Sequence, residues 1–154
     1  MKKSPIDAVD LLTTDHADVK KLFAQYEGLS DRSRATKKKI ADQICHALTV
    51  HAALEEQLFY PAVRKATGDD DMVDEAEVEH GSAKDLIAQI SQSDPDEHLF
   101  DARISVLSEL IAHHVEEEEN DMFKKARTAN LDLPMLREQM LQLKDALEKN
   151  QVSA

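Results

Sequence analysis

Residues 51–60 read His-Ala-Ala-Leu-Glu-Glu-Gln-Leu-Phe-Tyr, and residues 114–123 read His-Val-Glu-Glu-Glu-Glu-Asn-Asp-Met-Phe. Each stretch begins with a histidine, has a glutamate four residues later, and ends in a hydrophobic pair. Residues four apart lie one above the other on the same face of an α-helix, about 6 Å apart along its axis. His51 with Glu55, and His114 with Glu118, therefore each predict a two-pronged chelate on one helix face.

Two further segments carry a histidine on an otherwise apolar face. His16 takes one step of the apolar repeat within residues 9–26, and His80 takes one step of the repeat within residues 73–90. In a helical bundle the apolar faces meet along one central line, so these side chains are expected to meet there. The expected group consists of His16, His51, Glu55, His80, His114 and Glu118.

The apolar spacing and the start and stop signals predict four long helices and a shorter fifth one. They are expected from the start signal Ser4-Pro5 to Gly28, from Ser30-Asp31 to Thr67, from about Asp71 to Ser93, from about Pro95 to Ala129, and after Pro134. Pro61 is expected to kink the second helix. With helices predicted throughout, the expected fold class is all-α. Short loops between them make neighbouring helices antiparallel. We expect an antiparallel up-down four-helix bundle in residues 1–129. An additional short C-terminal helix in residues 130–154 would pack on the bundle or mediate self-association, such as a homodimer.

Composition excludes several classes of protein. The 154 residues include 3 glycines, 4 prolines and no tryptophan, which favours helix over sheet. A formal net charge of −12 opposes binding to nucleic acid or to an anionic membrane surface. The single cysteine, Cys45, excludes an intramolecular disulfide framework and fits a reducing compartment. With no long apolar run and no signal-peptide pattern, we expect a cytoplasmic protein.

A metal explains the polar residues on the apolar faces. A buried ionised carboxylate must be paired, bound to a metal or protonated, and no lysine or arginine on these faces is available to pair with Glu55 or Glu118. Mixed imidazole and carboxylate ligands suit iron, manganese or zinc. Six ligands are too many for one tetrahedral zinc and suit two metals bridged by the glutamates. Ferritin-like bundles use a different pattern, Glu-x-x-His, dominated by carboxylates, whereas here the pattern is His-x3-Glu and imidazoles dominate.

A known family shares this ordered set of residues. The chain resembles the hemerythrin-like (HHE cation-binding) family over about residues 5–127. The resemblance is carried by Asp15-His16, by His51-x3-Glu55-Glu56 followed by Leu58-Phe59-Tyr60-Pro61, by Glu79-His80, and by His114-x3-Glu118. The resemblance implies two iron ions (Fe2+/Fe3+), oxo- or hydroxo-bridged, in an up-down bundle. Members of the family bind dioxygen reversibly, sense oxygen or iron, or handle peroxide or nitric oxide. The implied partner is therefore a small diatomic ligand or peroxide.

The chain departs from the dioxygen-carrying hemerythrins at two positions, one on the third helix and one on the fourth. Those proteins have His-x3-His on the third helix and His-x4-Asp on the fourth, whereas Ala76 and Lys84 flank His80 here and Glu118 replaces the aspartate. Alanine cannot ligate, and a charged lysine has no lone pair to give. Water, Glu77 or a tyrosine could take the position. Fewer imidazoles weaken the case for reversible dioxygen carriage and favour redox turnover or sensing.

Several functions remain open at this point. The chain could bind or react with these small molecules for sensing, detoxification or storage, or it could be an enzyme that decomposes peroxide or counters nitrosative damage. It could also be an iron- or oxygen-responsive interaction module whose fold the metal stabilises, or a plain bundle with incidental histidines.

The remaining polar and aromatic residues have simpler interpretations. Glu116–Glu119 cannot all face inward, since neighbours on a helix differ by about 100°, so all but Glu118 are expected to be solvated. Glu56 is expected on the surface or bonded to a ligand histidine. His113 is expected to lie outside the site. The residues expected on the surface are His46, His98 and Lys37–Lys39, and those expected to pack around the site are Tyr26, Phe59, Tyr60 and Phe123.

Overall fold

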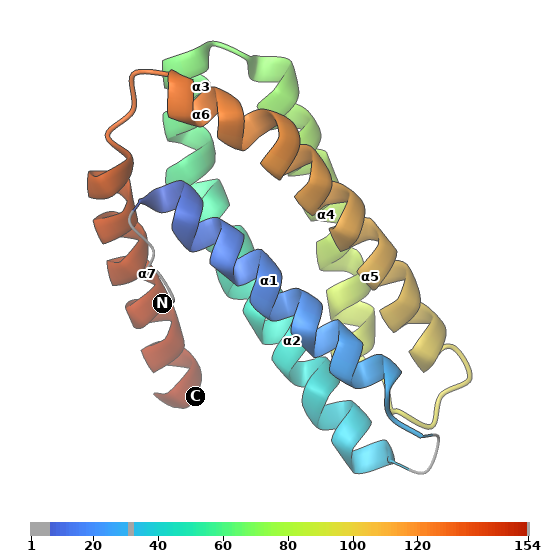
Figure 1. The fold of residues 1–154 in the computed structure, drawn as a ribbon. Helices are drawn as coiled ribbons and strands as arrows, with labels where there is room; N and C mark the ends of the chain where they lie inside the picture. The colour runs from blue at the N-terminus through green and yellow to red at the C-terminus, as the bar shows by residue number, and fades with distance from the viewer. Residues whose placement is uncertain (1–6, 31–32, 154) are drawn as a thin grey trace.

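The structure is a computed structural model that describes residues 7–30 and 33–153, with side chains up to residue 149. Its four long helical rods run up and down and enclose a central line, with one more helix beside them (Figure 1). Two rods are continuous: α1 (Ala8–Glu27) and α4 (Asp70–Gln92). The described residues contain no strand. The predicted all-α, antiparallel four-helix bundle with an additional C-terminal helix is confirmed.

The other two rods each contain one π-helical turn. The second rod consists of α2 (Arg34–Leu54), η1 (Glu55–Phe59) and α3 (Tyr60–Thr67). The last rod of the bundle consists of α5 (Phe100–Glu117), η2 (Glu118–Met122) and α6 (Phe123–Thr128). Each π turn begins at the glutamate of a His-x3-Glu pair. A π turn ends two residues before Pro61, where a kink was expected, and the kink itself stays a prediction.

A π turn changes which side chains share a face with the glutamate. The backbone N–H of Tyr60 donates to the carbonyl of Glu55, and that of Phe123 donates to the carbonyl of Glu118. These bonds span five residues instead of the usual four. The residue five places after each glutamate is thereby brought onto the glutamate's side of the helix. In both rods that residue is aromatic.

Helix starts differ from the expected ones at two places, in the second rod and in the last rod. The Asp7 carboxylate caps α1 by accepting the N–H of Asp10, while the expected start at Ser4-Pro5 lies outside the described residues. The second rod begins at Arg34, after the expected Ser30-Asp31.

The last rod begins at Phe100 and not at Pro95. The Asp94 carboxylate accepts the N–H of Asp96 at 2.9 Å, and this local turn competes with a helix. The end of the second rod is as expected, because Gly68 adopts the left-handed conformation, with φ +70°, that terminates helices.

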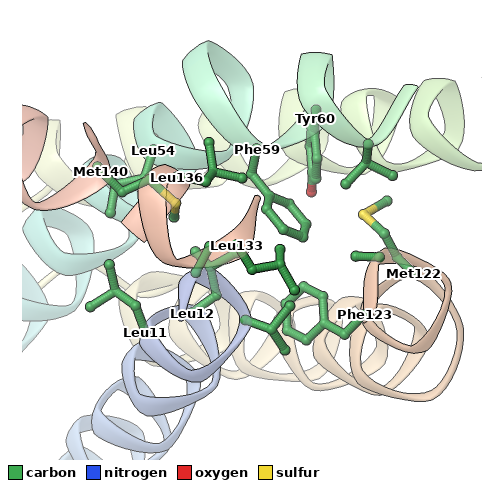
Figure 2. Packing of buried hydrophobic residues seen from close by; sticks show 14 of the residues in the cluster. Leu11, Leu12, Leu54, Phe59, Tyr60, Met122, Phe123, Leu133, Leu136 and Met140 are labelled. Atoms are coloured by element: carbon green, nitrogen blue, oxygen red, sulfur yellow. The ribbon is translucent and has the colours of Figure 1, made fainter. Parts of the chain in front are cut away.

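Two hydrophobic clusters fill the bundle, one on each side of a polar layer. The π-turn cluster includes Leu12, Leu54, Phe59, Met122 and Phe123 (Figure 2). The loop-end cluster, on the other side of the polar layer, includes Phe23, Ile44, Phe100 and Leu107. The site residues lie between the two clusters and belong to neither.

The C-terminal helix α7 (Leu133–Ser153) closes the π-turn end of the core. It packs against α1, α2 and η1, and its Leu136 and Met140 point toward Leu12 and Leu54 of the bundle (Figure 2). Packing on the bundle was one of the two roles expected for this segment, and self-association stays a prediction. None of the described helices is long and apolar enough to cross a membrane.

Lys37 was expected on a solvated face, and this prediction is wrong. Its side chain is buried, and its Nζ donates to both carboxylate oxygens of Asp101, at 3.2 and 3.1 Å. The Tyr26 hydroxyl donates to the same carboxylate. Tyr26 therefore lies in the loop-end cluster and not beside the metal-ligand candidates. A lysine can lie along apolar surface when its ammonium group has such a partner.

Candidate metal centre

The six side chains singled out from the sequence converge in the polar layer between the two clusters. They come from all four rods: His16 on α1, His51 and Glu55 on the second rod, His80 on α4, and His114 and Glu118 on the last rod. Each is buried, and the two glutamates are the most enclosed, with 0% and 2% of their surface exposed.

The six side chains form two half-sites that share both glutamates. In the first half-site, His16 and His51 meet Glu55 and Glu118, with one ligand atom from each within 4.8 Å of the others. In the second half-site, His80 and His114 meet the same two glutamates within the same limit. The fourfold set of imidazoles is thus divided into two pairs.

Each glutamate contacts an imidazole of both half-sites. Glu118 places one oxygen 3.1 Å from His16 Nε2 and the other 3.3 Å from His114 Nε2. Glu55 Oε1 lies 3.3 Å from His51 Nε2 and 3.1 Å from His80 Nε2. Both carboxylates therefore lie between the two pairs of imidazoles and contact each pair.

A carboxylate outside the central group holds each histidine by its other ring nitrogen. The Nδ1 atoms contact a carboxylate oxygen at 2.7 Å for His16–Glu119, 3.1 Å for His51–Asp15, 2.8 Å for His80–Glu56 and 2.8 Å for His114–Glu79. An Nδ1–H that donates to a carboxylate fixes the ring orientation and leaves the Nε2 lone pair for a metal. All four rings are therefore oriented with Nε2 toward the centre.

These outer carboxylates link the rods in a closed cycle. Asp15 of α1 holds His51 of α2, Glu56 of η1 holds His80 of α4, Glu79 of α4 holds His114 of α5, and Glu119 of η2 holds His16 of α1. Every one of them is the chain neighbour of a central residue. Each rod thus supplies one central histidine and orients the histidine of the next rod.

Of these outer carboxylates, only Glu56 had its observed role among the predictions from the sequence. The expectation that Glu119 is solvated is wrong, because it is half-buried and holds His16. For Glu56 the second of the two expected roles, a bond to a central histidine, is the one observed. Asp15 and Glu79 were not recognised as orienting groups. The signal available was their position directly before His16 and His80.

Tyr60 was expected to pack around the site, and the structure brings its hydroxyl into the second half-site. The hydroxyl donates to Glu118 Oε2 at 2.6 Å and lies 3.0 Å from His80 Nε2 and 3.3 Å from His114 Nε2. Its side chain is completely buried. Water, Glu77 and a tyrosine were considered for the missing ligand position near His80, and the Tyr60 hydroxyl lies at that position.

Neither Glu77 nor Phe123 places a further oxygen beside the central histidines. Glu77 is exposed, and its carboxylate lies 3.6 Å from Arg64. Phe123, which matches Tyr60 in the repeated motif, stacks on His16 with ring centroids 5.6 Å apart and planes 6° apart. The two half-sites therefore differ by one hydroxyl group.

The buried glutamates govern the protonation of the histidines. Burial by itself lowers the pKa of His51, but the charge of the nearby Glu55 and the hydrogen bond that His51 donates to Asp15 outweigh it and raise the pKa to about 10. Burial acts in the same way on His114, and Glu118 and Glu55 raise its pKa to about 12. Without a metal, protons on these imidazoles neutralise the two carboxylates.

The nitrogen and oxygen atoms of the central side chains are better satisfied by a bound metal than by hydrogen bonds to one another. Glu55 Oε2 and His51 Nε2 are buried without a hydrogen-bond partner among the described residues. A buried polar atom left without a partner costs free energy that a bound cation would recover. Imidazole and carboxylate together suit iron, manganese or zinc. The arrangement is that of a metal-binding site.

The other histidines lie outside this group. His98 is exposed as expected, whereas His46, also expected on the surface, is half-buried on α2. His113 is exposed and lies outside the site, as expected. His113 pairs with Glu117 at 2.6 Å, and Glu79 completes a third cluster there, which is largely exposed. Cys45 is a buried free thiol in the loop-end cluster.

Comparison with known proteins gives three matches. The family model described as the hemerythrin HHE cation binding domain matches residues 7–126. A DNA nickase of Nostoc sp. (strain PCC 7120) is 30% identical over 125 residues, which are 81% of this chain and 35% of that protein. The chain thus spans about a third of the length of that relative.

The third match concerns the fold. The crystal structure of a hemerythrin HHE cation binding domain-containing protein from Mycobacterium kansasii superposes with a TM-score of 0.81 at 19% sequence identity. The match covers 96% of this chain and 91% of that one. The four rods and the additional helix are therefore an arrangement also found in a solved structure.

Proposed function

We propose, since the chain belongs to the hemerythrin HHE cation-binding family, that it is a non-haem di-iron protein that binds or reacts with dioxygen, peroxide or nitric oxide. One observation carries the proposal. Glu55 and Glu118 each contact imidazoles of both half-sites, so that the two carboxylates are placed between two cation positions. Two ferrous ions at these positions would supply two electrons to a small oxidant at one place.

In this proposal the four Nε2 atoms are the terminal ligands and the two glutamates bridge. His16 and His51 would hold one ion, and His80 and His114 would hold the other. Tyr60 would be the further ligand of the second ion, in the position where the dioxygen carriers have another histidine. A phenolate ligand favours the ferric state, which supports redox turnover over reversible dioxygen carriage.

The surrounding residues would keep this centre in order. The outer carboxylates fix the tautomer of each imidazole, and their removal would let the rings turn. The apolar clusters on both sides exclude water and strengthen every electrostatic contact within the layer. The partner we propose is a small molecule and not nucleic acid, because the chain carries a net charge of −12.

A second candidate function is favoured by a specific contact. Lys144 of α7 lies 3.2 Å from Asp15, which in turn holds His51. Metal loss would free His51 and loosen this link between the centre and the C-terminal helix. The chain could then act as an iron- or oxygen-responsive interaction module, in which α7 releases from the bundle when the metal leaves.

Metal analysis together with an ultraviolet-visible spectrum of freshly purified protein tests the main proposal. We expect two irons per chain and the near-ultraviolet absorption of an oxo-bridged ferric pair. Zinc alone, or a single ion per chain, would overturn it. Circular dichroism and proteolysis with and without a chelator test the second candidate, which fails if both forms are equally folded and equally resistant.

A further inference from the structure

A cavity of about 260 Å³ opens directly onto the metal-binding layer. All four central histidines line it, and it extends from them toward the loop-end cluster. The opposite side of the layer, toward the π turns, is filled by Phe59, Tyr60 and Phe123 (Figure 2). An apolar space for a ligand therefore lies on the loop-end side of the centre, while a second pocket, lined mainly by polar residues of α4 and the last rod, reaches His114 and Glu118.

Beyond the histidines and their carboxylate partners Asp15, Glu56 and Glu79, the walls of this cavity are mainly aliphatic. They are made by aliphatic side chains of α1, α2, α4 and α5, namely Val19, Leu48, Ala52, Ile87, Leu110 and Ile111. The exposed residues Thr49, Gln57 and Lys84 also contribute, so the cavity reaches the surface between the second rod and α4. A ligand would meet polar groups at the inner end and hydrocarbon along its length.

The volume is larger than the small ligands of the proposed function require. An apolar cavity of about 150 Å³ already accommodates benzene. Dioxygen, nitric oxide or hydrogen peroxide would leave most of this space unfilled and could not contact its aliphatic walls on all sides. A compact hydrocarbon group would bury its surface there at about 25 cal/mol per Å².

We propose that the cavity binds the hydrocarbon part of a compact organic molecule and presents its polar end to the metal-binding layer. This inference rests on the proposed function, whose ligand of matching chemistry is an organic hydroperoxide, R–O–OH. Its reduction breaks the O–O bond and yields R–OH and water. The reduction consumes two protons and two electrons, and the electrons come from two ferrous ions that become ferric.

The first test measures binding without any reaction. The probe is 2-phenyl-2-propanol, the unreactive alcohol analogue of cumene hydroperoxide, added to metal-free and to zinc-loaded protein and followed by NMR chemical shifts. The variant Ala52→Leu fills part of the cavity from a half-buried position. Ala112→Leu is the matched control, since Ala112 is exposed on α5 and does not line the cavity.

We expect saturable binding to the wild-type chain and to Ala112→Leu, and at least about tenfold weaker binding to Ala52→Leu, equivalent to 1.4 kcal/mol. Absence of saturable binding to the wild-type chain, or equal binding to both variants, would overturn the inference. Shifts in the metal-free protein report the cavity alone, so this result does not depend on the metal.

The second test separates this inference from the proposed function. Iron-loaded, reduced protein is mixed with cumene hydroperoxide or with hydrogen peroxide, and oxidation of the iron is followed. Ala52→Leu should slow the reaction with the organic peroxide at least about tenfold more than it slows the reaction with hydrogen peroxide. An equal effect on both would overturn the inference. Alcohol binding with no reaction of either peroxide would support the apolar ligand and overturn the peroxide chemistry of the metal pair.

Discussion

The two halves of the metal-binding layer are built from one motif used twice, and they differ at its last residue. Residues 51–60 and 114–123 each place a histidine and a glutamate one turn apart, begin a π turn at the glutamate, and end in an aromatic residue on the same side. In one copy that residue is Tyr60, whose hydroxyl reaches His80 and His114. In the other copy Phe123 stacks on His16.

This difference indicates a centre that is symmetric in its bridges and asymmetric in its terminal groups. The shared glutamates belong equally to both halves, so their loss should affect both. The tyrosine belongs to one half, so its loss should change that half alone. The following predictions test this division, beginning with the largest effect.

Replacing Glu118 by alanine should remove metal from both halves. The substitution takes a carboxylate oxygen from each half-site and leaves His16 and His114 without their bridging partner. We expect the metal content, measured by elemental analysis, to fall close to zero. His51→Ala should also lower it sharply, whereas His113→Ala should leave it unchanged because His113 is exposed and outside both half-sites. Equal metal content in the three variants would refute the ligand assignment.

Acidification should release the metal, and the tyrosine-containing half should respond more steeply. Glutamate charges raise the pKa of His51 to about 10 and that of His114 to about 12, so protons compete with the metal throughout the neutral range and gain as the pH falls. Burial also raises the pKa of the Tyr60 phenol, which adds one more proton to displace at the second half-site. Dialysis at about pH 5 should empty the protein. Retention of the full metal content there would contradict this expectation.

Removing an outer carboxylate should weaken metal binding by a smaller amount. Asp15→Ala frees the Nδ1 of His51 in the first half-site, and Glu79→Ala frees that of His114 in the second. Each should lower metal affinity about 10- to 100-fold, measured by competition with a chelator. Glu116→Ala, at an exposed position on the same helix as His114, is the control. If it weakens binding as much as Glu79→Ala, the orienting role assigned to Glu79 is wrong.

Exchanging the two aromatic residues should have the smallest effect on metal content and the clearest effect on the spectrum. Tyr60→Phe should keep two ions and abolish visible phenolate-to-iron charge-transfer absorption. Phe123→Tyr should add a hydroxyl beside His16 and make the halves more alike. A visible band that survives Tyr60→Phe would show that Tyr60 is not a ligand.

The sequence predicted the parts of this molecule that follow a helical period. The four rods and the central positions of His16, His51 and His80 follow from apolar spacing, because each histidine replaces an apolar residue on a buried face. The π turns do not follow from it, since one extra residue in a turn leaves no gap in a short apolar pattern. Tyr60 was for that reason expected only to pack around the site.

Residues that act across helices were harder to predict. Asp15 and Glu79 lie about 100° around the helix from the central histidines, where a carboxylate normally faces water. Their role depends on the neighbouring rod, which the period of a single helix does not report. Lys37 was misplaced for the same reason, because its partner Asp101 lies 64 residues away in the chain.

Anomalous X-ray diffraction at the iron edge, from crystals of the purified protein, tests the central claim most directly. The account predicts two peaks per chain, with Glu55 and Glu118 between them, His16 and His51 on one peak, and His80 and His114 on the other. A single peak, or a peak only at the exposed Glu79–His113–Glu117 cluster, would contradict it.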